Sequence, residues 1–365
     1  MVNKLVFANL RFRPVRSFLS ITAIALEVVM ILTIVGLSRG TLSESQRRQR
    51  GIGADIIVRP RGSSALSFSA APIPEGVANW VEKEVPHVTQ ATGMIIQPLE
   101  GISTMAGVDL EDFLRLSGRF RFRAGRAFQG DREVIVDGFY AKQNNLVPGS
   151  KLRLMNREWT VSGIIEEGKL SRVIGPMRVI QDLTGNTGKI SQIYVKVDNP
   201  ANVGPVIKFL KSKLEGYPIY SMEEFISLFS MNNTPGLKAF IGVVIGLSVV
   251  IGFLVVFLSM YTAVLERTRE VGIQKALGAT PAFILGVLLR ETAILAAVGS
   301  TAGILLSYGT RWLIVTFVPA SLGSEIAPDW WPIAAGIALA GALLGAAYPG
   351  MRAARQDPIE ALSYE

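Results

Sequence analysis

The 365-residue sequence contains no cysteine and a single histidine. Without cysteine the chain can form no disulfide and has no thiolate nucleophile or metal ligand. One histidine excludes metal sites built from several imidazoles. Charged residues are also scarce, at 18%, against about a quarter in typical globular domains. A net charge of +8 is compatible with nucleic-acid binding, but the basic residues mostly flank apolar segments. These features exclude disordered, collagenous and disulfide-rich classes and indicate a membrane protein.

Four apolar blocks are each long enough to cross a bilayer, which takes about 20 residues. They predict crossings at 17–38, 237–265, 285–312 and 331–349. The predicted fold class is a multi-pass α-helical membrane protein with four transmembrane helices, in a 1+3 arrangement. A large extracytoplasmic α+β domain is expected between helices 1 and 2. The first block could instead be a cleaved signal peptide, but its long apolar run favours a crossing.

Basic residues predict the orientation of the chain. They are concentrated in the N-terminal lead at 1–16, in the loop at 266–284 and in the tail at 350–365, which the positive-inside rule places in the cytoplasm. The opposite loop, at 313–330, carries Glu325 and Asp329. Both termini are therefore expected to be cytoplasmic.

The segment at 39–236 is the expected extracytoplasmic domain, with a β-rich insertion at about 109–180 and stalk helices. A polar helical stretch at 42–50 would continue the first crossing, and Ser221 would cap a helix. Arginines alternate with phenylalanines at 114–126. This pattern favours a charge-protected edge strand, or contact with anionic lipid or a partner protein, over nucleic-acid binding. The lone His87 is interpreted as a surface or packing residue.

Several residues inside the crossings are candidates for function. Glu27 is the one carboxylate deep in a crossing, where an ionised group is costly. It could contact a proton or substrate, form an inter-subunit hydrogen bond, pair within the helix bundle, or snorkel towards the membrane surface. Small-xxx-small spacings allow close helix approach and predict packing or dimer surfaces. They occur at Gly242 and Gly246, Gly299 and Gly303, and Gly341 and Gly345.

The loop after the second crossing, ERTREVGIQKALGATPAFI, has the pattern of a short amphipathic helix at the inner membrane face. Gly278 and Pro281 predict where that helix stops. A helix joined directly to two crossings is suited to being pushed by a partner. An interfacial helix that only orients the chain explains the spacing equally well.

This loop resembles the E-R-x-x-E-[IV]-G-x-x-[KR]-A-x-G-A signature of FtsX/MacB-type ABC transporter permeases. The start at 9–26 and the end at 348–365 are also similar to that family. The resemblance implies a coupling helix seated on an ATPase, and a multi-pass protein of the bacterial cell (inner) membrane. The coupling residues it implies are Glu266, Arg267, Arg269, Glu270, Gly272, Lys275, Ala276, Gly278 and Ala279.

The resemblance also implies partners. It predicts a permease dimer, with identical chains expected, and an ABC-type ATPase, in two copies, that binds ATP and Mg²⁺. The chain itself has no GxxxxGK[ST] phosphate loop, and only about 16 residues precede the first crossing. A separate ATPase subunit is therefore expected, with no cofactor, metal site or catalytic residue in this chain. Membrane lipid and a periplasmic adaptor are further expected partners; nucleic acid is not.

Members of this family have more than one kind of function. The function implied first is an exporter permease that couples ATP hydrolysis to movement of the outer domain (mechanotransmission). Its substrate would be hydrophobic, a peptide or lipid-linked. The alternatives are an FtsX-like signalling permease that regulates a cell-wall hydrolase, and a lipoprotein-releasing permease. The size of the outer domain favours the MacB type.

Overall fold

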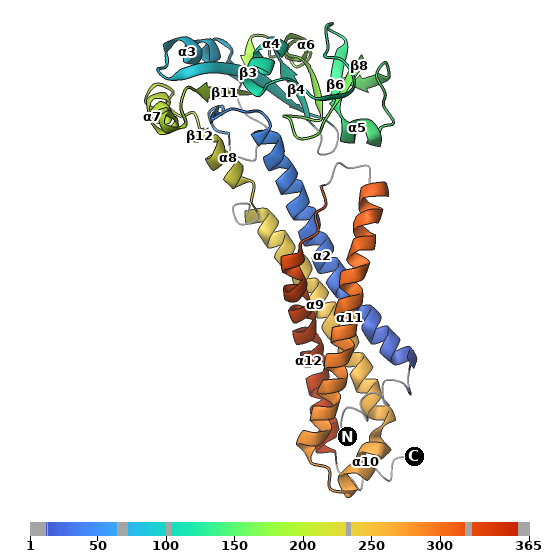
Figure 1. Ribbon diagram of the computed structural model, residues 1–365. Helices are drawn as coiled ribbons and strands as arrows, with labels where there is room; N and C mark the ends of the chain where they lie inside the picture. Colours follow the sequence, from blue (N-terminus) through green and yellow to red (C-terminus); the bar gives the residue numbers. More distant parts are fainter. Residues whose placement is uncertain are drawn as a thin grey trace. The chain divides into compact units, whose positions relative to one another are not determined.

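The computed structural model describes residue 12 and residues 14–63, 72–99, 104–230, 235–317 and 323–356. Most of the predicted N-terminal lead and the last nine residues of the tail lie outside this range. The described residues form two compact units. The helical unit contains residues up to 40, 235–317 and from 324 on, and the α/β unit contains residues 41–230. Figure 1 labels their elements.

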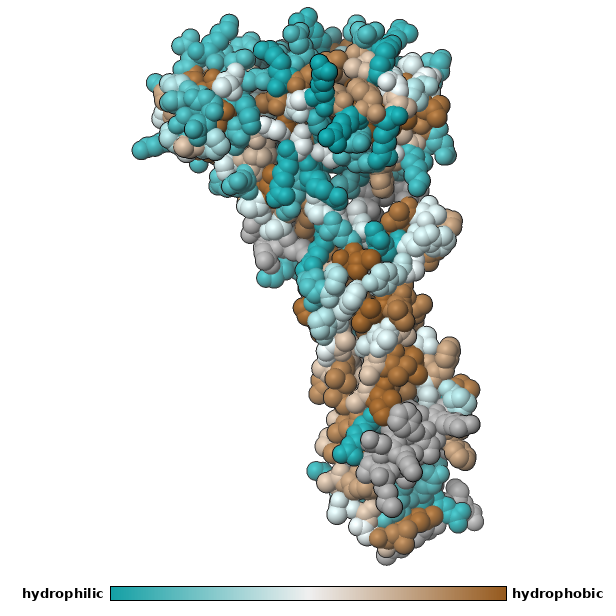
Figure 2. Space-filling model, in the orientation of Figure 1, coloured by the Kyte–Doolittle hydropathy of each residue, from teal (hydrophilic) through white to brown (hydrophobic). Residues whose placement is uncertain are grey.

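Four long helices dominate the helical unit (Figure 1). They are α2 (Pro14–Arg50), α9 (Pro235–Glu266), α11 (Pro281–Phe317) and α12 (Trp331–Arg355). All four are long and apolar enough to cross a membrane, and Figure 2 shows hydrophobic residues covering much of their surface. The α/β unit comes between α2 and α9 in the chain, so the predicted fold class is confirmed.

Helix α2 is longer than the crossing predicted at 17–38. Its 37 residues span about 55 Å at 1.5 Å per residue, against a hydrocarbon layer of about 30 Å. The additional length includes the polar stretch at 42–50, whose predicted helical structure is confirmed. Within α2, the residues from Thr41 to Arg50 belong to the α/β unit.

Small residues bring the long helices close together. A Cβ added to Gly303 of α11 would lie 2.7 Å from the carbonyl oxygen of Ala25 in α2, and one added to Gly345 of α12 would lie 2.8 Å from that of Phe253 in α9. Helix α12 also has an alanine every four residues along its buried face, at 334, 338, 342 and 346. One helix face is therefore built from small side chains, as close packing between membrane helices requires.

The α/β unit is organised around a ten-stranded mixed sheet, in the order β12-β1-β11-β3-β4-β9-β6-β8-β5 with β7 paired to β8. Strands β4 and β9 pair in parallel, as do β6 and β8, and the other pairs are antiparallel. A separate two-stranded sheet joins β2 (Ile73–Pro74) and β10 (Lys189–Ile190). The strands of the large sheet are β1 (Ile56–Val58), β3 (Val88–Pro98), β4 (Thr104–Val108), β5 (Phe122–Gly125), β6 (Glu133–Asp137), β7 (Lys151–Leu154), β8 (Arg157–Ile165), β9 (Val173–Pro176), β11 (Gln192–Val197) and β12 (Ile219–Ser221).

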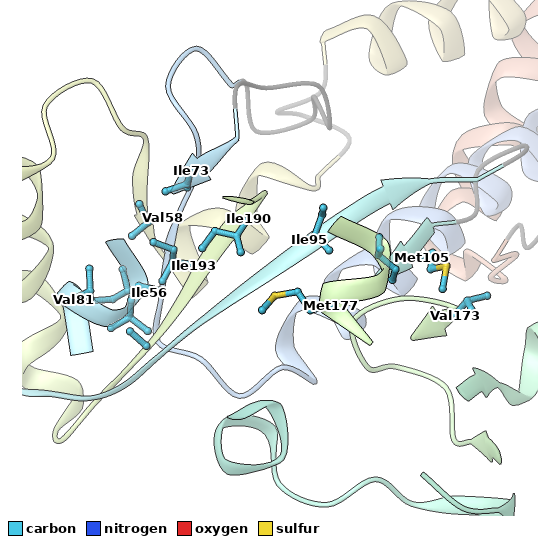
Figure 3. Packing of buried hydrophobic residues seen from close by; sticks show 14 of the residues in the cluster. Ile56, Val58, Ile73, Val81, Ile95, Met105, Val173, Met177, Ile190 and Ile193 are labelled. Atoms are coloured by element: carbon cyan, nitrogen blue, oxygen red, sulfur yellow. The ribbon is translucent and has the colours of Figure 1, made fainter. Parts of the chain in front are cut away.

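Most of the large sheet is covered on both faces, and successive strand residues point to opposite sides. Ile56 and Val58 pack into one apolar cluster, part of which Figure 3 shows, while Ile57 between them packs into another. Helices α3 (Gly76–Glu84), α5 (Gly138–Gln143), α6 (Met177–Leu183) and α7 (Val203–Lys213) contribute to the first cluster. Helices α4 (Leu110–Ser117) and α8 (Met222–Leu228) contribute to the second. The unit therefore has three layers.

The strands of the predicted insertion at 109–180 extend this sheet beyond β4. Residues 122–125 of the arginine-rich segment form β5 at the sheet edge, so the edge-strand interpretation is confirmed for this part, while residues 114–117 belong to α4. Arg126 bonds to Glu133 at 2.7 Å. This bond and the backbone amide of Gln129 lower the pKa of Glu133 to about 2. Charge is thus held at the edge, where it opposes pairing with another chain.

Two local predictions are also confirmed. The Ser221 hydroxyl accepts a hydrogen bond from the backbone amide of Glu224 at 3.1 Å and caps α8. His87 is a surface residue with 52% of its side chain exposed, and its Nδ1 lies 2.9 Å from Asp198 Oδ2.

The glycine contacts predict which substitutions the helix bundle tolerates. We expect Gly303→Leu to lower the thermal stability of the detergent-purified protein, because overpacking a close contact costs about 1–3 kcal/mol. Gly309→Leu is the matched control on the same helix, since a Cβ there meets no atom within 4 Å. Equal melting temperatures for the two variants would contradict the packing described here.

Candidate functional site

The segment joining α9 to α11, residues 266–284, is called the α9–α11 connection below. After α9 ends at Glu266, a short helix α10 (Thr268–Ala276) begins. Gly278 follows with φ +95°, a conformation that glycine adopts without steric cost. The Thr280 hydroxyl accepts a hydrogen bond from a backbone amide in the first turn of α11, whose first residue is Pro281. The predicted helix stop at Gly278 and Pro281 is confirmed.

One anchor of the connection is a buried carboxylate. Arg267, the residue between α9 and α10, is only 8% exposed. Its Nη1 lies 3.4 Å from Oε2 of Glu291, in α11, and Nη2 of Arg16, in α2, lies 2.5 Å from Oε1 of the same carboxylate. Glu291 is completely buried. One carboxylate therefore joins the connection to two of the long helices.

A second anchor joins the connection to α12. The Lys275 ammonium donates a hydrogen bond to the carbonyl of Ala354 at 3.0 Å, and another to the carbonyl of Gln356. The last carbonyls of a helix have no partner within it, and its C-terminus carries partial negative charge. A lysine at this position both donates hydrogen bonds to these carbonyls and places a positive charge beside the helix C-terminus. Lys275 thus binds the end of α12.

The remaining residues of the connection leave an apolar tip exposed. Leu277 is 84% exposed, and Ile273 and Phe283 are also exposed. Around Leu277 lies a shallow depression of about 450 Å³ lined by Gln274, Leu277, Gly278, Ala279, Thr280 and Phe283. A projecting leucine beside a depression is suited to protein contact.

The structure separates the nine predicted coupling residues by burial. Arg267 and Gly272 are buried, while Lys275 and Ala279 are half-buried. The other five are exposed, namely Glu266, Arg269, Glu270, Ala276 and Gly278. The signature therefore combines residues that attach the connection with residues available to a partner, and the coupling role of all nine stays a prediction.

Glu27 lies inside the helix bundle of its own chain and is 4% exposed. A Cβ added to Gly252 of α9 would come within 2.0 Å of its Oε2, and one on Gly341 of α12 within 3.9 Å of its Oε1. Oε1 has no hydrogen-bond partner among the described residues. The carboxyl group occupies a notch that two glycines leave open.

The three glycine pairs differ in their surroundings. Gly299 and Gly303 pack against α2, and Gly345 packs against α9. Gly242 and Gly246 of α9 are exposed, and a Cβ at either position would meet no described atom within 4 Å. In the part of the chain that the structure describes, therefore, nothing packs against Gly242 and Gly246. Among the described residues, no group of three or more His, Asp or Glu side chains is placed to bind a metal.

Sequence reasoning missed an ion-pair network in the α/β unit. Glu44 and Arg48, near the end of α2, meet Asp137 and Arg172 from the sheet. Arg48 lies 2.8 Å from both Glu44 and Asp137, and Arg172 lies 2.6 Å from Glu44. The i,i+4 spacing of Glu44 and Arg48 was visible in the sequence, but their partners were not. Burial lowers the pKa of Arg172, and neighbouring Arg48 lowers it further.

Comparison with protein-family models gives two matches. A MacB-like periplasmic core domain matches residues 17–212, more than half of the chain. The C-terminal part of an FtsX-like permease matches residues 242–358, which include the whole of the α9–α11 connection.

Individual relatives share only part of their sequence with this chain. The macrolide export ATP-binding/permease protein MacB of Nitrobacter winogradskyi is 24% identical over 389 residues, covering 98% of this chain and 59% of that protein. The uncharacterized ABC transporter permease YknZ of Bacillus subtilis is 36% identical over 154 residues, covering 41% of this chain and 37% of the relative. The chain thus spans less than two thirds of the length of these relatives.

Two solved structures are similar to part of the chain. The periplasmic region of MacB from Actinobacillus actinomycetemcomitans has a TM-score of 0.38 at 17% identity, covering 48% of this chain and 92% of that one. The extracellular domain of the noncanonic ABC-type transporter YknZ from Gram-positive bacteria has a TM-score of 0.36 at 17% identity, covering 46% and 99%.

The ion-pair network predicts a local loss of stability on mutation. We expect Arg172→Met in the full-length protein to speed amide hydrogen exchange in β6 and β9, because removing one partner of a buried pair costs about 3–5 kcal/mol. Arg115→Met is the control, since Arg115 forms an exposed pair with Asp112 and such pairs contribute little. If the two variants exchange alike, the network does not stabilise this part of the sheet.

Proposed function

Because this chain belongs to the FtsX/MacB-type family of ABC transporter permeases, we propose that it is the membrane permease subunit of an ABC exporter. A separate ATPase subunit hydrolyses ATP, and the permease converts this work into movement of the α/β unit outside the membrane. The exported substrate is a hydrophobic compound, a peptide or a lipid-linked molecule. The permease itself is not an enzyme.

The observation that carries the proposal is the exposed tip of the α9–α11 connection. Leu277 projects from it with 84% of its surface exposed. Glu270 and Arg269 are exposed on the helix that precedes this tip. An apolar anchor with charged residues at its rim is a common form of protein interface. This tip is the proposed seat of the ATPase.

The anchors of the connection support its proposed mechanical role. Arg267 joins it to α11 through Glu291, and Lys275 joins it to the end of α12. The connection is also covalently continuous with both α9 and α11. A force applied at Leu277 is therefore passed to three long helices rather than absorbed by a loose loop.

The ATPase would supply the nucleotide chemistry. MacB relatives are named as both ATP-binding and permease proteins, and this chain matches 59% of one of them. The 365 residues contain no GxxxxGK[ST] motif, and we propose that ATP and Mg²⁺ bind two copies of an ABC-type ATPase. We place the connection and both termini in the cytoplasm of a bacterial cell and the α/β unit outside the inner membrane.

We also propose that the permease works as a dimer of identical chains. The exposed pair Gly242 and Gly246 on α9 supports this, because small residues allow close approach of a second helix. A periplasmic adaptor and membrane lipid are the remaining proposed partners.

The first test is affinity purification of the chain from its native membrane in gentle detergent, followed by mass spectrometry and an ATPase assay. We expect an ABC-type ATPase to co-purify with the parent protein. Leu277→Glu should reduce the amount of bound ATPase at least about tenfold, because loss of a central interface contact costs more than about 1.4 kcal/mol. Charge reversal at Glu266 and Glu270 should weaken binding in the same direction.

The matched control is Val147→Glu, which adds the same charge at a residue of the α/β unit that is 62% exposed. It should bind the ATPase as the parent does. The proposal is overturned if no ATPase accompanies the intact parent protein, or if Leu277→Glu retains it in full. An adaptor found in the complex would favour export, and a cell-wall hydrolase would favour signalling.

A further inference from the structure

The carboxylate of Glu291 occupies a position that the family signature does not include. It lies in α11, near the α9–α11 connection, and is completely buried. Its two oxygens accept from different partners, Oε1 from Arg16 at 2.5 Å and Oε2 from Arg267 at 3.4 Å. The two arginines come from α2 and from the corner between α9 and α10. Three segments of the chain therefore meet at one side chain.

Helices α9 and α11 are joined to the connection directly, whereas α2 and α12 have no covalent link near it. Helix α12 is bound to the connection through Lys275. Arg16 lies 275 positions from Glu291 in the sequence, yet it is bonded to the carboxylate that holds Arg267. A displacement of the connection therefore has a direct polar route to α2.

We infer that Glu291 is a positioning residue that carries displacement of the α9–α11 connection to α2. This inference rests on the proposed function, in which an ATPase displaces the connection. When Arg267 and α11 move, the carboxylate moves with them and pulls or pushes Arg16.

The burial of the carboxylate makes this link strong. A buried carboxylate is tolerated only when it is paired. The 2.5 Å bond to Arg16 is short, as bonds between charged groups in a low-dielectric environment are, while the contact with Arg267 is longer, at 3.4 Å. The carboxylate therefore cannot leave both arginines without a large penalty. The amide of a glutamine has nearly the same shape but no charge, so Glu291→Gln weakens the link while leaving the packing nearly unchanged.

The absence of cysteine from the chain allows movement to be measured at single introduced thiols. Leu19 of α2 is 58% exposed and Val298 of α11 is 48% exposed, so Leu19→Cys and Val298→Cys can each be labelled with an environment-sensitive fluorophore. The complex with its ATPase is reconstituted in lipid, and fluorescence is compared without nucleotide and with ATP plus vanadate. In the parent background both positions should respond.

In the Glu291→Gln background we expect the ATPase to bind as before, because the exposed tip at Leu277 is unaltered. The label at position 298 should still respond, while the response at position 19 should fall at least about fivefold, the lower range of allosteric coupling. Arg16→Gln removes only the α2 side of the link and should give the same result, and it serves as the second variant if Glu291→Gln is poorly produced.

The inference is overturned if position 19 responds as in the parent, or if both positions fall silent together with the ATPase bound, since a purely structural role would affect both helices. Failure of the proposed function has a different signature. In that case no ATPase binds even the parent protein, and neither label responds to nucleotide.

Discussion

The hydrocarbon interior of a membrane offers no hydrogen-bond partners, so every backbone amide and carbonyl within it must bond inside the chain. The four long helices meet this constraint, and much of the helical unit follows from it. Lipid is as apolar as the helix surfaces, so burial of apolar area does not select one packing arrangement over another. Close contact does. The small face of α12 and the glycines of α11 supply it, because they bring backbones within van der Waals distance of neighbouring helices.

The same constraint favours polar pairs near the ends of the long helices. Arg267 and Glu291 are buried at one end, with Arg16 half-buried beside them, and Lys275 binds carbonyls at the end of α12. Glu27 differs, because its carboxyl group lies among the helices, close to Gly252 and Gly341. An ionised carboxylate would be costly in that notch, and the role of Glu27 stays a prediction.

The connection between α9 and α11 combines an exposed tip with two anchors to the long helices. Its tip exposes Leu277, while Arg267 and Lys275 fasten it to the long helices. The chain belongs to the FtsX/MacB-type permease family, and in the function proposed above the exposed tip would bind the ATPase while the two anchors would link it to the long helices. Ion pairs also hold the α/β unit together. Asp137 and Arg172 pair with Arg48 and Glu44 and fasten the last turns of α2 to the sheet.

The sequence by itself determined the crossings, the cap at Ser221, the helix stop at Gly278 and the family signature, because each depends on residues that are near one another along the chain. Only the tertiary structure decided that Arg267 pairs with Glu291, that Gly303 faces inward while Gly242 does not, and that β4 lies beside β9. These outcomes depend on which helix faces and strand edges meet. Residues that are far apart in sequence carry no local mark of their partners, so the contacts exist only once the whole chain has packed.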